Sequence, residues 1–251
     1  MDEFQETSVL ITSNFGGGGS GVIFRSSYKG TVILTNAHIC DAIEGGGTVY
    51  DSKPHTILAF KRSKLHDVCY IFIRANLFLD TQLSSSPPEV NTKIYISGHP
   101  SLYPHIVSQG YVAGTDNYPI HMDDRACTEV EMKASPMQCI LSGHPILQSR
   151  EAVIASALIS PGSSGSAVFN DDGELVGLAF AAQGDIGYAL VVPWKYLNGF
   201  VRHEAKTLKW ERPSLDKKRV RYENEGIFDL DNWEKILKLI NEKNQCLKLC
   251  P

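Results

Sequence analysis

Short runs of β-branched and aromatic residues recur along most of the chain, separated by Gly, Asn, Asp or Pro. Such runs are typical of β-strands, because branched and aromatic side chains pack well on a pleated, half-buried surface. No helical pattern alternates with them, which argues against a parallel α/β sheet. About a dozen strands at this spacing predict an all-β barrel or sandwich. The runs are SVLITS, GVIFRS, TVILTN, TILAFKR, DVCYIFIR, KIYISG, HIVSQGYVAG, EVEMK, SAVFN, ELVGLAF and IGYALVV.

The last quarter of the chain carries the helical patterns. Residues 193–203 (PWKYLNGFVRH) begin with proline, which suits the first turn of a helix because the amide hydrogens there have no partner within the helix. Residues 229–244 (DLDNWEKILKLINEKN) predict an amphipathic helix with acidic residues at its start. The segment between them, 206–222, holds seven basic and two acidic residues and is interpreted as a solvated connector. The apolar face of the second helix would carry Leu230, Trp233, Ile236, Leu237 and Ile240.

The chain divides into a long β-rich part and a short C-terminal part. Residues 1–202 are interpreted as one domain of two β lobes, joined near 80–91 (DTQLSSSPPEVN), where polar residues and prolines indicate a connection. Residues 203–251 form an extension made of the basic connector and the C-terminal helix. Residues 115–150 are interpreted as an irregular segment. A protein partner could bind at 115–150 or at 203–251, and the sequence does not choose between them.

Composition and charge exclude several classes of protein. The chain has 251 residues and 43% apolar composition, enough to bury a substantial core. A formal net charge of −4 points neither to nucleic acid nor to a membrane surface, and no apolar run reaches the length of a transmembrane helix. The first residues, MDEFQETSVLITS, lack the basic-then-apolar order of a secretory signal. We therefore expect a cytoplasmic protein if Met1 is the native start.

Six cysteines in this length of chain are too sparse for a disulfide scaffold. Cys40 and Cys69 lie in apolar, strand-like contexts and are expected to be buried, reduced thiols. Cys246 and Cys250 have the spacing i, i+4 and could form half of a metal site. The sequence identifies no further ligands, so we expect no metal.

The glycine-rich run GGGGSG at 16–21 formally matches the G-x-G-x-x-G pattern of dinucleotide sites. Such a site needs a helix next, so that the helix N-terminus meets the pyrophosphate. Strand-like residues follow here instead, so we expect no nucleotide cofactor. We interpret the run as a mobile glycine loop in front of a strand.

The run SPGSSGS, residues 160–166, predicts a tight turn that holds a reactive serine. Small residues leave backbone N–H groups unobstructed, so that they can converge on a developing oxyanion. Ser164 is the expected nucleophile, because one glycine follows it directly and another stands two residues before it. The oxyanion hole is predicted at Gly162, Ser163 and Ser164, with Ser163 as a spacer between the two donating N–H groups.

A serine hydroxyl needs a neighbouring base, and the base needs an orienting acid. The segment ILTNAHICDAI places His38 directly after an apolar strand, at a rim outside the core. The segment HDVCYIFIR places Asp67 at the mouth of another apolar strand, where an imidazole N–H would satisfy a partly buried carboxylate. The acids Asp41, Asp51 and Asp80 compete with Asp67 in weaker contexts.

The sequence resembles trypsin-like serine proteases of the chymotrypsin fold, especially their HtrA (Deg)-like branch. The similar blocks, in that branch's order, are GSGVIF, ILTNAH, HDVCYIFI, SGHP…IVSQGYVAG, SPGSSGSAVFNDDGELVGLAFA and GYALVVPWKYL. They cover roughly residues 7–202, and the order His38, Asp67, Ser164 also matches. The resemblance implies a double β-barrel with a C-terminal helical extension, a serine endopeptidase acting on protein or peptide substrates, and no cofactor.

The sequence departs from that family at several points. Gly165-Ser166-Ala167 stands where the family usually has Gly-Gly-Pro, and the chain after the protease body is too short for a PDZ domain. By the resemblance, apolar or small residues near 157–160 and 178–183 should line the substrate pocket, which predicts cleavage after small or medium apolar residues. A catalytically silent trypsin-fold binding module remains the alternative. The expected pocket residues are Leu158, Leu178, Phe180, Ala181 and Ala182.

Overall fold

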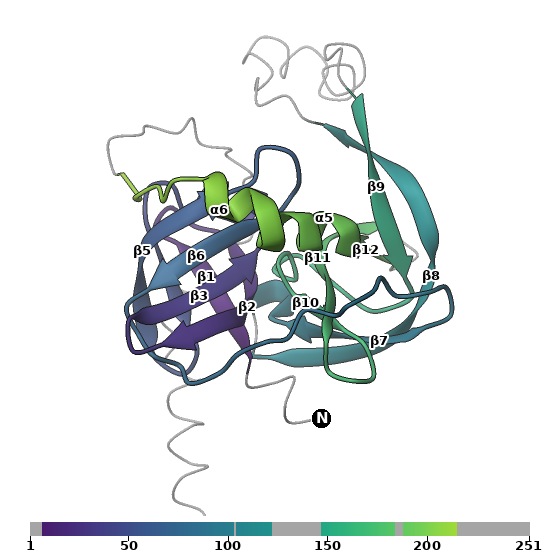
Figure 1. The fold of residues 1–251 in the computed structure, drawn as a ribbon, viewed down its shortest axis with the longest axis horizontal. Coiled ribbons are helices and arrows are strands. Elements are labelled where there is room, and N and C mark those ends of the chain that lie inside the picture. The colour runs from purple at the N-terminus through teal and green to yellow at the C-terminus, as the bar shows by residue number, and fades with distance from the viewer. Residues whose placement is uncertain (1–6, 103, 122–146, 184–187, 215–251) are drawn as a thin grey trace, which may run out of the picture.

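The structure, a computed structural model, describes residues 7–102, 104–121, 147–183 and 188–214. They form two closed antiparallel β-barrels, each made of six strands, with a helical segment at the C-terminal side (Figure 1). The predicted all-β, double-barrel chymotrypsin-like fold with a C-terminal helical part is therefore confirmed.

The first barrel has the strand order β1-β2-β3-β6-β5-β4 and closes where β1 pairs with β4. A short helix, α2 (Ala37–Ala42), follows β3 and leads toward β4. The strands of this first barrel are β1 (Ser8–Ser13), β2 (Gly18–Ser27), β3 (Gly30–Thr35), β4 (Gly47–Tyr50), β5 (Pro54–Arg62) and β6 (Cys69–Ile73).

The second barrel has the order β10-β11-β12-β9-β8-β7, and residues 74–92 connect it to the first. A short helical turn, η1 (Pro100–Leu102), separates its first two strands. The strands of this second barrel are β7 (Lys93–Gly98), β8 (Ile106–His121), β9 (Leu147–Ala155), β10 (Ala167–Phe169), β11 (Leu175–Gln183) and β12 (Tyr188–Val192).

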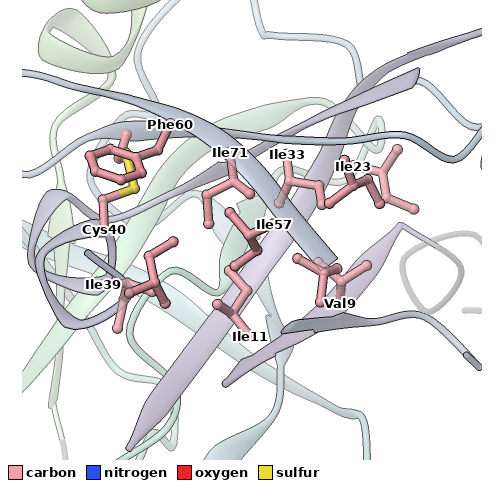
Figure 2. Close-up of a cluster of buried hydrophobic side chains, with 13 residues drawn as sticks. Val9, Ile11, Ile23, Ile33, Ile39, Cys40, Ile57, Phe60 and Ile71 are labelled. Atoms are coloured by element: carbon pink, nitrogen blue, oxygen red, sulfur yellow. A yellow bond between two sulfur atoms is a disulfide. The ribbon is translucent and has the colours of Figure 1, made fainter. Parts of the chain in front are cut away.

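Alternation along each strand decides which core a side chain joins. On β6, Ile71 and Ile73 face the interior of the first barrel, whereas Tyr70 packs outside it. Figure 2 shows the interior cluster, which is almost entirely aliphatic. Its members are Val9, Ile11, Ile23, Ile33, Ile39, Cys40, Ile43, Val49, Ile57, Phe60, Cys69, Ile71 and Ile73.

A second buried cluster joins the two barrels and the C-terminal helical segment. That segment is continuous through α5 (Trp194–Gly199), η3 (Phe200–Glu204) and α6 (Ala205–Thr207), and it starts directly after β12 (Figure 1). The helix predicted at 193–203 is thus confirmed and runs further. The cluster contains Val22, Phe24, Leu34, Val68, Tyr70, Ala167, Phe169, Leu175, Leu178, Val192, Leu197, Phe200 and Ala205.

The prediction of an irregular segment at 115–150 is wrong at both ends of that range. β8 continues to His121 and β9 begins at Leu147, so the two strands pair as a ribbon from Thr115↔Val153 outward. Polar residues predominate at 115–121, so no run of β-branched and aromatic residues marked the strand. The expected strand EVEMK lies outside the described residues, as do the helix predicted at 229–244 and Cys246 and Cys250.

Cys40 and Cys69 are buried, as expected, but the prediction that they are reduced is wrong. Their sulfur atoms form a disulfide that spans 29 positions of the chain. Cys69 starts β6 and pairs with Thr35 at the end of β3, so the helix that follows β3 passes close to it. An apolar context shows that a thiol is buried, but it does not show which other thiol faces it.

The start of the expected solvated connector, 206–222, also differs from prediction. Residues 206 and 207 end the helix, and Glu211 then pairs with Phe60 of β5 through two backbone hydrogen bonds. The ring of Trp210 lies 5.9 Å from that of Phe72. The chain up to residue 214 is therefore docked on the first barrel.

In the part of the chain that the structure describes, no helix is both long and apolar enough to cross a membrane. Among these same residues, no group of three or more His, Cys, Asp or Glu side chains is arranged to hold a metal ion.

Candidate active site

His38 is held at the rim of the first barrel by the turn between β3 and α2. It lies in the first turn of α2, two residues after Asn36, which is fully buried. The Asn36 side chain donates a hydrogen bond from Nδ2 to the backbone oxygen of Asp67 at 3.0 Å. The pairing of Thr35 with Cys69 brings the chain after β3 beside the chain before β6. The antiparallel register therefore places His38 next to Asp67.

The carboxylate of Asp67 contacts His38 twice. Its Oδ2 lies 2.8 Å from Nδ1 of the imidazole, and its Oδ1 accepts a hydrogen bond from the His38 backbone N–H at 3.0 Å. The Asp67 side chain is 15% exposed and that of His38 is 45% exposed. With Nδ1 bonded to a carboxylate, the other ring nitrogen, Nε2, is the one left to exchange a proton with a reacting group.

The pKa of His38 is raised above its ordinary value by neighbouring acids. Burial is the largest single influence and acts to lower this pKa. The charge of Asp67, the hydrogen bond to Asp67 and the charge of Asp41 together outweigh burial. The imidazolium that forms when His38 takes up a proton is therefore stabilised where it stands.

The serine turn of the second barrel docks directly against the first barrel. Gly165 has φ +85°, and a Cβ there would collide with the backbone oxygen of Ser20 and with Oγ1 of Thr35. The backbone N–H of Ser20 also donates to the oxygen of Ser164 at 2.7 Å. Only glycine permits this approach, and it brings Ser164 to the end of β3, three residues before His38.

The Ser164 hydroxyl does not bond to His38 in this structure. Its Oγ donates to the backbone oxygen of Phe180 at 3.1 Å, and none of the hydrogen bonds between described residues joins Ser164 to the imidazole. The two residues are nevertheless close in the fold. Gly19 packs between the side chain of Ile39, which follows His38, and the backbone oxygen of Ser164. The structure therefore places the turn of Ser164 and the His38–Asp67 pair at the junction of the barrels, without a hydrogen bond between Ser164 and His38.

Two backbone N–H groups in the serine turn are left without protein partners. The N–H groups of Ser163, Gly165 and Ser166 donate to the oxygens of Ser160, Ala179 and Ser163. Within the described ranges, neither the N–H of Gly162 nor that of Ser164 donates a hydrogen bond. Because the N–H of Ser163 already donates to the oxygen of Ser160, Ser163 would be only a spacer between the two donors of the predicted oxyanion hole.

Ser20 is a residue of this region that sequence reasoning missed. Its hydroxyl donates to the oxygen of Gly162 at 2.9 Å and accepts from the N–H of His99 at 2.8 Å, so it holds the serine turn from the opposite barrel. The glycine run around it, interpreted as a mobile loop, contributes instead to β2. A Cβ at Gly19 would clash with Ile39 and Ser164, so these glycines allow close packing.

The five expected pocket residues differ widely in exposure. Leu178 is 0% exposed and packs in the cluster between the barrels, so no substrate side chain can reach it, and its prediction is wrong. Leu158 is 81% exposed. Phe180 packs partly against the same cluster, while Ala181 and Ala182 lie nearer the surface on β11. Leu178 points out of the second barrel into the cluster at the junction, which the resemblance alone did not reveal.

Comparison with known proteins agrees with this architecture. A model of the trypsin-like peptidase domain matches residues 19–178. No curated protein matches the sequence. The fold is similar to an inactive-form mutant of Rv3671c from M. tuberculosis, with a TM-score of 0.64 and 16% identity over 82% of this chain and 90% of that chain. It is also similar to the serine endoprotease from Yersinia pestis, with a TM-score of 0.59 and 19% identity over 82% of this chain and 66% of that chain.

Proposed function

The chain belongs to the trypsin-like peptidase domain family, and we propose that it is a serine endopeptidase that cleaves protein or peptide substrates through an acyl-enzyme. The observation that carries this proposal is the meeting of two half-sites at the junction of the barrels. One is the His38–Asp67 pair, at 2.8 Å. The other is the Ser164 turn, whose backbone lies against Ser20 and Thr35.

In the proposed mechanism the Ser164 hydroxyl first leaves the oxygen of Phe180 by rotation about its Cα–Cβ bond. His38 Nε2 takes its proton as Oγ attacks the peptide carbonyl, and Asp67 stabilises the resulting imidazolium. The N–H groups of Gly162 and Ser164 stabilise the tetrahedral oxyanion. His38 then protonates the leaving amine. Water, activated by the same imidazole, finally releases the acyl group and restores the Ser164 hydroxyl.

We further propose that the enzyme cleaves after small or medium apolar residues. Phe180 lies on β11, and its backbone oxygen accepts from the serine hydroxyl; Ala181 and Ala182 follow it on the same strand. Leu158 precedes the serine turn with an exposed side chain. No acidic residue stands among these four to bind the Lys or Arg side chain of a substrate. Cleavage of a peptide library mainly after lysine or arginine would contradict this specificity.

A fluorophosphonate probe tests the proposed activity, because it reacts with a serine only when a base activates the hydroxyl. The wild-type protein should be labelled and Ser164→Ala should not. Ser156→Ala is the matched control, since its hydroxyl bonds only within the β8–β9 ribbon, near Tyr111. Labelling of Ser164→Ala would reject the assignment of the nucleophile.

Absence of labelling in the wild type, under conditions that label a known serine protease, would favour the alternative of a catalytically silent binding module. A protein partner at 115–150 or 203–251 stays a prediction. The cytoplasmic location also stays a prediction, and the Cys40–Cys69 disulfide counts against it because such bonds persist in oxidising compartments.

A further inference from the structure

The carboxylate of Glu204 reaches from the C-terminal helix to the turn that carries Asp67. Its two oxygens accept hydrogen bonds from the Ser63 hydroxyl at 2.9 and 2.8 Å, and one of them also accepts from the backbone N–H of Lys64 at 3.1 Å. Ser63 is buried and Glu204 is partly buried. Hydrogen bonds to an ionised acceptor are stronger than neutral ones, especially where water is excluded. Glu204 therefore fixes the start of the turn.

Ser63 links Glu204 to the part of the turn that carries Asp67. Its hydroxyl oxygen accepts from the backbone N–H groups of Leu65 and His66, each at 3.1 Å. Its own N–H donates to the oxygen of Val68 at 3.0 Å, which closes the turn. Asp67 stands between the two anchored residues His66 and Val68, so its backbone position depends on Ser63.

The helix that carries Glu204 is tied to the second barrel. It starts directly after β12, and the hydroxyl of Tyr196 donates to Glu151 of β9 at 3.3 Å. The ring of Tyr196 stacks on that of His66, with 4.0 Å between the ring centroids. An element that begins in the lobe of the serine turn therefore holds the turn that carries Asp67 in the other lobe.

We propose that Glu204 is a positioning residue, which acts through Ser63 to keep the Asp67 carboxylate aligned with His38 across the junction of the barrels. This inference rests on the proposed function, since it concerns the same acid–base pair. Asp67 meets His38 through two atoms, at 2.8 and 3.0 Å, and a shift of the turn would lengthen both contacts. A misaligned base costs rate, because proton transfer requires the imidazole in its reactive orientation.

The pH profile gives this proposal a readout that simple loss of stability would not produce. Asp67 raises the pKa of His38 against the effect of burial. When Asp67 moves away, that pKa falls. The acid limb of kcat/KM reports the base of the free enzyme, so weakening the Glu204 contact should move the acid limb to lower pH.

The test compares Glu204→Gln with Glu211→Gln in the full chain. The substituted glutamine would keep Oε1, which accepts from the N–H of Lys64 and from the Ser63 hydroxyl at 2.9 Å. It would lose the negative charge and place an amide NH₂, which cannot accept, at the 2.8 Å contact with Ser63. Glu211 is the matched control: it lies on the same C-terminal segment and loses the same charge, but its carboxylate faces Arg62 at 3.9 Å. We expect kcat of Glu204→Gln to fall about tenfold, with the acid limb displaced to lower pH, and no such displacement in Glu211→Gln.

A double-mutant cycle with Ser63→Ala sharpens the result. If Glu204 acts through Ser63, the double variant should be no slower than the more affected single variant. An acid limb that stays in place in both Glu204→Gln and Ser63→Ala, in an active enzyme, overturns the proposal. A wild-type enzyme without peptidase activity or labelling would instead reject the proposed function, so the two failures are distinguishable.

Discussion

The two barrels contribute unequal halves of the candidate site. In the first, His38 and Asp67 are already joined by two hydrogen bonds, and the Cys40–Cys69 disulfide ties the helix of His38 to the strand that follows Asp67. In the second, the Ser164 hydroxyl bonds to Phe180 of its own barrel instead of to the imidazole.

The His38–Asp67 half is fixed by several contacts, whereas the Ser164 hydroxyl has a single bond to the backbone of its own barrel. A carboxylate–imidazole pair loses alignment easily, so it is built on paired strands and a covalent cross-link. In the proposed mechanism the serine hydroxyl rotates about its Cα–Cβ bond, while glycines and Ser20 hold the backbone of its turn against the first barrel.

The largest effect is expected from removing the base. His38→Ala should lower kcat by about 10⁶-fold, as much as Ser164→Ala, and the double variant should be no slower, because the two side chains act as one unit. His55→Ala is the control, since His55 forms a similar pair with Asp51 at 3.1 Å elsewhere on the first barrel. Steady-state hydrolysis of one peptide substrate measures all four variants. If His38→Ala keeps a tenth of the activity, the base is another residue.

The next effect concerns the cross-link of the first barrel. A disulfide that closes a loop of this length, 29 positions, should stabilise the fold by about 3–4 kcal/mol. The urea midpoint of the wild type should therefore fall in the presence of a thiol reductant. In Cys40→Ala/Cys69→Ala the midpoint should be low from the start and indifferent to the reductant. A reductant-insensitive wild type would mean that the bond does not form.

A smaller effect is expected where the second barrel meets the first. Gly165→Ala places a methyl group against Ser20 and Thr35 and forces alanine to φ +85°, which should cost about 2 kcal/mol and slow the enzyme. Gly16→Ala separates the two causes, because its φ is +91° but nothing lies within 4 Å. Unfolding in urea and kcat should both respond in Gly165→Ala, whereas Gly16→Ala should lose only stability. Equal loss of activity in both variants would contradict the role given to this contact.

Sequence reasoning reached the strands and the candidate residues because both leave local signals. Runs of β-branched and aromatic residues predicted strands such as β6, and a turn of glycines and serines before an apolar run predicted the position of Ser164. His38 and Asp67 stood out because each adjoins an apolar strand. The outer part of β8 escaped because residues 115–121 are mostly polar. Strand β9 escaped although Ala152, Val153 and Ala155 are buried, because only two β-branched residues, Val153 and Ile154, stand together there.

Signals local to the sequence were enough to identify an all-β chain that resembles trypsin-like proteases, with His38, Asp67 and Ser164 as candidate residues. Four features emerged only from the folded molecule: Cys40 pairs with Cys69, Leu178 is buried between the barrels, Ser20 braces the serine turn, and Glu204 holds the turn of Asp67. The physical reason is distance along the chain. Strand propensity and turn chemistry act between neighbours in sequence, whereas each of these contacts joins segments that only the closure and docking of the barrels bring together.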